Sequence, residues 1–191
     1  MTPRAAAGVL RARLYAQRRV AYYACAAALL VGLLAPAGPA GPVFFGSLLG
    51  IILALAQSPG LHPHLDRCEQ SAPLFGRELA RAKALVPCVA AALATTVYVL
   101  AQAFRGGTDV PFVFVVAVAA VVTSTLVALS ATIRRGFARA LYVLLACATS
   151  AAAFAIAITG RSLLGELGFC AVVAFLALRQ YGETLARYDP I

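Results

Sequence analysis

The sequence predicts an all-α, polytopic membrane protein with six transmembrane helices, one domain over residues 1–191 and both termini in the cytoplasm. The chain is 62% hydrophobic and only 12% charged, and its mean hydropathy is +0.89. A soluble domain carries about a quarter charged residues because its surface must be hydrated. About half of that charge is missing here, so lipid is the expected solvent for most of the surface. Two further observations, the apolar segments and the distribution of charge, complete the prediction.

Six apolar segments are long enough to cross a bilayer. A helix needs about 20 apolar residues for a hydrocarbon core of about 30 Å, and short spans need somewhat fewer. Backbone groups in lipid must be hydrogen-bonded within their own segment, so all six are expected to be helices. The predicted spans cover residues 20–37, 42–57, 85–104, 110–133, 140–159 and 163–178.

The charge distribution predicts the orientation. Five basic residues precede the first span, four lie between spans two and three, three lie between spans four and five, and two follow span six. The other side receives only Arg105 and Arg161. By the positive-inside rule, both termini are expected in the cytoplasm. The net charge of +9 is therefore interpreted as a topology signal spread along the chain, and nucleic acid is not an expected partner.

Residues 1–19 form a basic segment before the first span. Val9, Leu10 and Leu14 fall roughly on one side of a helix, with arginines around them. A helix lying on anionic lipid is the natural interpretation, and a basic tail without regular structure is the alternative.

Residues 61–86 form the longest polar stretch between two spans, and residues 61–84 are expected to be a cytoplasmic loop. The stretch holds both histidines, three of the seven acids and four of the sixteen basic residues. Ser71 is placed to cap a helix that begins near Pro73. On that helix the apolar residues fall within an arc of about 140°, and Arg77, Arg81 and Lys83 fall outside it. Glu78 falls inside the apolar arc and needs a partner, either Arg81 or a group from another element.

This helix has two interpretations. It is either a headgroup-layer helix that only links two spans, or a site where a soluble partner docks. The run from Pro73 to Lys83 resembles the coupling-helix region of type-2 ABC exporter permeases, in which a proline is followed by a glutamate five residues later and a lysine ten residues later. Pro73, Glu78 and Lys83 match that spacing, and Arg77 matches a basic residue often found before the glutamate.

The resemblance implies a permease subunit of an ATP-driven exporter in a bacterial inner membrane. A separate ATP-binding subunit would dock on the loop, because the chain has no GxxxxGK[ST] run for ATP hydrolysis. A second permease chain, identical or not, would complete the transporter. The acidic stretch before the proline and the external segment between spans five and six are both shorter than is usual in that family. The residues implied in ATPase coupling are Pro73, Phe75, Arg77, Glu78, Arg81 and Lys83.

A weaker prediction concerns the interior of the spans. Glu166 is the only acid within a predicted span, and intramembrane acids are functional candidates by default. It lies one turn from the outer end, close to Arg161, so we expect a water-exposed interfacial acid rather than a transport site. Hydroxyl residues favour close helix packing and bond to backbone carbonyls. The candidate substrate path, if there is one, includes Thr95, Thr96, Ser124 and Glu166.

Other chemistry is not expected. His62 and His64 flank a proline and have no evident set of four ligands, so neither a metal nor a cofactor is predicted. The five cysteines have no CxxC spacing and are interpreted as small packing residues. The chain is not expected to be an enzyme, because the spans contain no paired carboxylates and no nucleophile with a base. A membrane-embedded enzyme therefore ranks below a non-transporting small helical subunit of a larger membrane complex, which is the main alternative to the permease.

Overall fold

The structure is a computed structural model that describes residues 3–36, 38–58, 76–106, 110–160 and 163–186. All the regular secondary structure in these ranges is helical, which confirms the all-α prediction. The helices are α1 (Pro3–Leu34), α2 (Ala40–Leu55), α4 (Gly76–Phe104), α5 (Val110–Thr132), α6 (Gly136–Gly160) and α7 (Leu163–Ala186).

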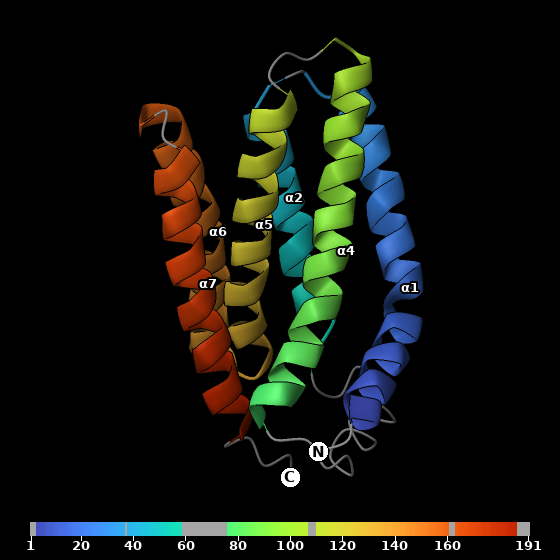
Figure 1. Ribbon diagram of the computed structural model, residues 1–191, viewed down its shortest axis with the longest axis vertical. Coiled ribbons are helices and arrows are strands. Elements are labelled where there is room, and N and C mark those ends of the chain that lie inside the picture. Colours follow the sequence, from blue (N-terminus) through green and yellow to red (C-terminus); the bar gives the residue numbers. More distant parts are fainter. Residues whose placement is uncertain (1–2, 37, 59–75, 107–109, 161–162, 187–191) are drawn as a thin grey trace.

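The helices run up and down along one long axis as a bundle (Figure 1). α4 contacts α1, α2, α5 and α7, whereas α5 contacts α2, α4, α6 and α7. These two helices therefore form the centre, with α1 on one flank and α6 and α7 on the other (Figure 1). α1 begins and α7 ends at the same end of the bundle, where α4 also begins.

Four of the described helices are long and apolar enough to cross a membrane, which makes this a membrane protein. They are α5 and α7 over their full lengths, α4 over Leu79–Phe104 and α6 over Gly136–Thr159. α2 is apolar but has only 16 residues, a length of about 24 Å. α1 carries arginines through its first half and is apolar only in its second half.

Two boundaries differ from the sequence prediction. Residues 3–34 form one continuous helix, so the pre-membrane segment and the first span are not separate elements. The alternative prediction, a basic tail without regular structure, is therefore wrong for residues 3–19. α7 continues two turns beyond residue 178, where the predicted span ended. Hydrophobicity ends there but the helix does not, because polar side chains stabilise its last turns through an i, i+4 ion pair.

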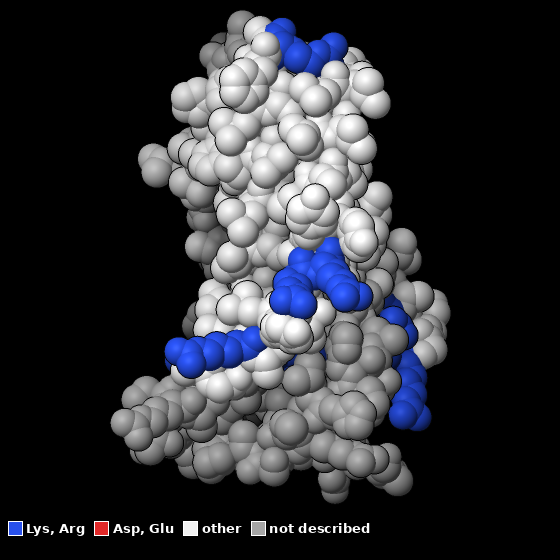
Figure 2. Space-filling model, turned by 90° about the vertical axis from the view of Figure 1, so that its right-hand side faces the viewer, with Lys and Arg blue, Asp and Glu red and all other residues white. Residues whose placement is uncertain are grey.

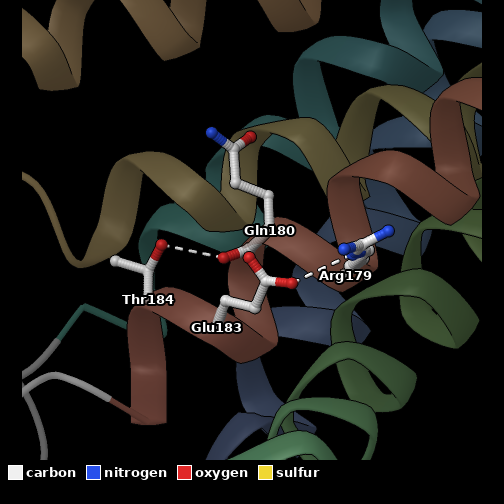
Figure 3. Close-up of polar contacts among 4 residues, drawn as sticks. All are labelled: Arg179, Gln180, Glu183 and Thr184. Atoms are coloured by element: carbon white, nitrogen blue, oxygen red, sulfur yellow. Dashed lines mark hydrogen bonds and ion pairs between the residues drawn. The ribbon is translucent and has the colours of Figure 1, made fainter.

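Figure 3 shows these last turns of α7. The Nε of Arg179 donates to Oε1 of Glu183 at 2.9 Å, and the Thr184 hydroxyl donates to the carbonyl of Gln180 at 2.8 Å. A hydropathy pattern reports where a helix leaves lipid, whereas these bonds allow it to continue into the polar layer.

Glycines let the helices of the bundle approach closely. A Cβ on Gly46 would lie 2.5 Å from the Thr95 hydroxyl of α4, and a Cβ on Gly50 would collide with the Thr125 hydroxyl of α5. Lipid is as apolar as the side chains, so membrane helices associate mainly through such close packing. The GxxxG spacing of these two glycines places α2 between α4 and α5.

We expect Gly50→Ala to destabilise the bundle by about 1–3 kcal/mol, as overpacking of a filled interior does. If the Thr125 side chain rotated to make room for the added methyl group, it would lose its 2.6 Å hydrogen bond to the Val121 carbonyl. The matched control is Gly168→Ala on α7, where an added Cβ meets nothing within 4 Å and helix propensity alone favours alanine. Denaturation of both variants in mixed detergent micelles, followed by circular dichroism, measures the difference. Equal stability of the two variants would contradict this account of α2 packing.

Candidate functional site

α1 begins and α7 ends at the same end of the bundle (Figure 1). This end is here called the basic end, because most of the described basic residues belong to the helix segments that lie toward it. The opposite end has Arg105 among its described residues. Figure 2 shows the face formed by α1, with lysine and arginine over its lower half. The described basic side chains of this end are Arg11, Arg13, Arg18, Arg19, Arg81, Lys83, Arg134, Arg135, Arg139 and Arg179.

A buried polar cluster joins α1 to the end of α2 at the basic end. The Arg13 side chain is 1% exposed, and its Nη1 donates to Oε1 of Gln57 at 2.9 Å. Gln17 lies one turn further along the same face of α1 and is also buried. Within the described ranges, neither amide atom of Gln17, nor the Nε2 of Gln57, has a hydrogen-bond partner. Such groups are costly to bury, so the cluster is an unusual feature of the interior.

Sequence reasoning missed this cluster. Arg13 and Gln17 are an i, i+4 pair and so lie on one face of α1. That spacing was the available signal, but among so many arginines it did not distinguish a buried side chain from an exposed one. Arg11 and Arg18, on other faces of the same helix, are exposed.

The predicted coupling residues are only partly within the described chain. Pro73 and Phe75 lie outside the described residues, as do His62 and His64. Arg77 and Glu78 lie in the first turn of α4, but their side chains are outside the description. The proposed partner of Glu78 therefore stays a prediction.

The structure contradicts the predicted exposure of Lys83. The helical arc placed Lys83 on the polar face, yet its side chain is 7% exposed. The segment does not lie alone on a membrane surface, because it is continuous with α4, which is contacted by four other helices. A side chain outside the apolar arc is therefore still covered by neighbouring elements.

Arg81 is exposed and lines a cavity of about 300 Å³ between α4 and α7. The other lining residues are Phe175, Leu178 and Arg179. Two guanidinium groups thus border one hollow at the basic end, and Arg179 is paired with Glu183. The arrangement makes the junction of α4 and α7 a basic site with an apolar floor.

The structure also contradicts the predicted environment of Glu166. Its side chain is 0% exposed, and neither carboxylate oxygen has a hydrogen-bond partner among the residues that the structure describes. The expectation of a water-exposed acid is therefore wrong. Glu166 lies on the same stripe of α7 as the buried residues Cys170, Ala177 and Tyr181, which is the face turned to the bundle. Its depth along the helix was readable from the sequence, but the direction of its side chain was not.

The hydroxyl residues of the candidate path bond within their own helices. Thr95 donates to the carbonyl of Ala91 at 2.9 Å, Thr96 to that of Ala92 at 2.8 Å, and Ser124 to that of Val121 at 3.0 Å. Thr95 also faces Gly46 of α2 closely. These contacts are those of packing residues, and the role of the three in a substrate path stays a prediction.

No protein-family model, no curated protein and no solved structure matches this chain. Its function is therefore inferred from the residues and their placement.

Arg13→Ala is expected to lower stability by about 1.5–3 kcal/mol, because it removes a charge-assisted hydrogen bond and leaves the buried Gln57 oxygen without its donor. Arg11→Ala is the matched control, since Arg11 lies two residues away on the same helix and is exposed. Its effect is expected within about 0.5 kcal/mol. Unfolding in mixed micelles distinguishes the two, and an equal effect would contradict a structural role for the Arg13–Gln57 bond.

Glu166→Leu is expected to raise stability by about 1–3 kcal/mol, because it removes an unpartnered polar group from an apolar interior. Glu166→Gln is the control, since it retains the polar atoms and should give a smaller gain. Thermal unfolding in detergent measures both. A clear loss of stability in Glu166→Leu would show that the carboxyl group has a stabilising partner.

Proposed function

We propose that this chain is the permease subunit of an ATP-driven exporter and that a separate ATP-binding subunit docks on residues 61–86. One observation carries the proposal: α4 begins at Gly76, within that segment, and runs as one helix to Phe104 at the far end of the bundle. A force applied at its first turns therefore acts directly on the helix that contacts α1, α2, α5 and α7.

The proposal includes six membrane spans with the basic end in the cytoplasm. The apolar second half of α1 and the 16 residues of α2 would be the first two. Short spans are accommodated by local thinning of the bilayer. The grouping of basic side chains at one end supports a cytoplasmic placement of that end, by the positive-inside rule, in a bacterial inner membrane.

Pro87 is the proposed pivot about which the first turns of α4 move relative to the rest of the helix. It lies inside α4, where a proline cannot donate to the carbonyl four residues earlier, which is that of Lys83. Prolines are a common cause of helix kinks, and the lower turns of α4 lean away from the axis of the upper turns (Figure 1). In the proposed mechanism, closure of the ATPase moves the segment before Pro87 and tilts the rest of α4 against its neighbours.

A six-span permease would work as a pair of identical or different chains. Large apolar side chains that such a pairing would cover include Phe137 near the start of α6 and Leu164 near the start of α7, both of which are exposed. The chemical class proposed for the substrate is hydrophobic: a lipid, an apolar small molecule or a peptide.

A non-transporting subunit of a larger membrane complex is the second candidate. It is favoured by the hydroxyl residues inside the bundle, which bond to their own helices and fill the interior in place of a polar passage. This candidate predicts association with a membrane assembly other than an ATPase.

The test is purification of the chain from its native membrane at its natural expression level, followed by identification of its partners. Wild-type protein is expected to retain an ATP-binding subunit. The double variant Glu78→Gln/Arg81→Gln should weaken that association at least about tenfold, the value of one charge-assisted hydrogen bond, because Arg81 is the exposed basic residue of the coupling segment.

Arg135→Gln is the matched control, because Arg135 is an exposed arginine of the basic end outside the coupling segment. It should leave the association unchanged. Retention of the ATPase and of transport by the double variant would contradict the coupling role. Recovery of the chain with a different membrane complex and no ATPase would favour the second candidate.

A further inference from the structure

A groove opens between α5, α6 and α7 near the basic end. Its volume is about 220 Å³, and these three helices are all long and apolar enough to cross a membrane. Val127, Val173 and Ala177 form part of its apolar wall. Leu145 and Leu176 also line it, and both side chains are about half exposed. The groove is therefore open to the lipid-facing surface of the bundle.

Polar groups gather toward the basic end of the groove. Ser130 lines it, is 4% exposed, and its hydroxyl has no hydrogen-bond partner among the described residues. Tyr142 lines it as well and accepts a hydrogen bond from the side-chain amide of Gln180. The guanidinium of Arg134 lies 4.2 Å from the centre of the Tyr142 ring, and its Nε is buried with no hydrogen-bond partner in the part of the chain that the structure describes.

Three arginines lie close together in the sequence where α5 ends and α6 begins, at this end of the groove. Arg134 and Arg135 follow the end of α5, and Arg139 lies in the first turn of α6. None of the three is paired with an acidic side chain among the described residues. The cation–π contact with Tyr142 holds Arg134 in place but leaves its charge uncompensated.

We propose that this groove binds an anionic phospholipid, with one acyl chain along the apolar wall and the phosphate at Arg134. The groups along the groove follow the same order as the parts of such a lipid. The apolar wall would contact the hydrocarbon chain, the Ser130 hydroxyl would contact the ester oxygens, and Arg134 would contact the phosphate. The distance along α6 from Tyr142 to Thr149 is about 10 Å, which accommodates the upper part of an acyl chain.

A second copy of the chain fits the groove less well. A two-fold symmetric contact brings the same patch of both subunits together and would place the unpaired arginines near those of the partner. An anionic headgroup neutralises the same charges. The inference needs only that α5, α6 and α7 lie in a membrane, so it does not depend on the proposed exporter function.

The chain has no tryptophan, so a single introduced one is a specific fluorescent probe. Leu145→Trp reports from the groove, and Leu144→Trp is the matched control on the neighbouring residue of α6, outside the groove. Each variant is reconstituted in vesicles of phosphatidylcholine and phosphatidylglycerol, with bromine on the acyl chains of one lipid or the other. Quenching then gives the relative association of each lipid with each site.

We expect Leu145→Trp to show about fivefold preference for phosphatidylglycerol, the effect of one arginine near a membrane surface, and Leu144→Trp to show much less. Adding Arg134→Gln to Leu145→Trp should remove most of the preference. Equal preference at the two positions, or preference that survives Arg134→Gln, would overturn the proposal. If neither brominated lipid quenched the fluorescence of Leu145→Trp, the proposal would also be overturned, because protein would then cover the groove. If Leu145→Trp does not fold, Leu176→Trp is the groove probe and Val172→Trp is its control.

Discussion

The close approach of α2 to α4 and α5 is the contact on which the rest of the bundle depends. Gly46 and Gly50 leave room for the hydroxyls of Thr95 and Thr125, and those hydroxyls are satisfied by carbonyls of their own helices. Neither side therefore brings an unpaired polar group to the contact. In lipid the association of helices rests on such packing more than on hydrophobic burial, so small residues set the distances between the helices. The alanine-rich cores around these contacts extend the same geometry along the bundle.

The two flanks of the bundle are packed very differently. The apolar windows of α4 and α5 are 61% and 56% buried, whereas those of α6 and α7 are 22% and 17% buried. Three of the unusual polar features lie where α7 meets the central helices or α6. They include the buried carboxyl of Glu166, the cavity beside Arg81 and the groove at Ser130. This less buried pair of helices, beside a more buried centre, is the part of the protein with the most surface available to a lipid, a substrate or another chain.

The basic end combines two kinds of charge with different physical roles. Exposed arginines such as Arg18 and Arg135 are placed to meet water and lipid headgroups. Arg13 and Lys83 are buried instead, so their charges must be compensated within the protein. The bond from Arg13 to Gln57 ties the N-terminal helix to the end of α2, immediately before the loop proposed to receive the ATPase.

The sequence by itself determined the helical class, the approximate positions of the helices and the grouping of basic residues at one end. Each of these follows from local rules, because a segment in lipid must satisfy its own backbone and charges must stay near the surface. Only the tertiary structure decided which face of each helix is buried. In spans rich in alanine and valine all faces are similarly apolar, so no pattern marked the inward directions of Glu166 and Lys83 or the pairing of Arg13 with Gln57. Those outcomes depend on neighbours distant in the chain. The two extra turns of α7 likewise depend on polar contacts that hydropathy does not record.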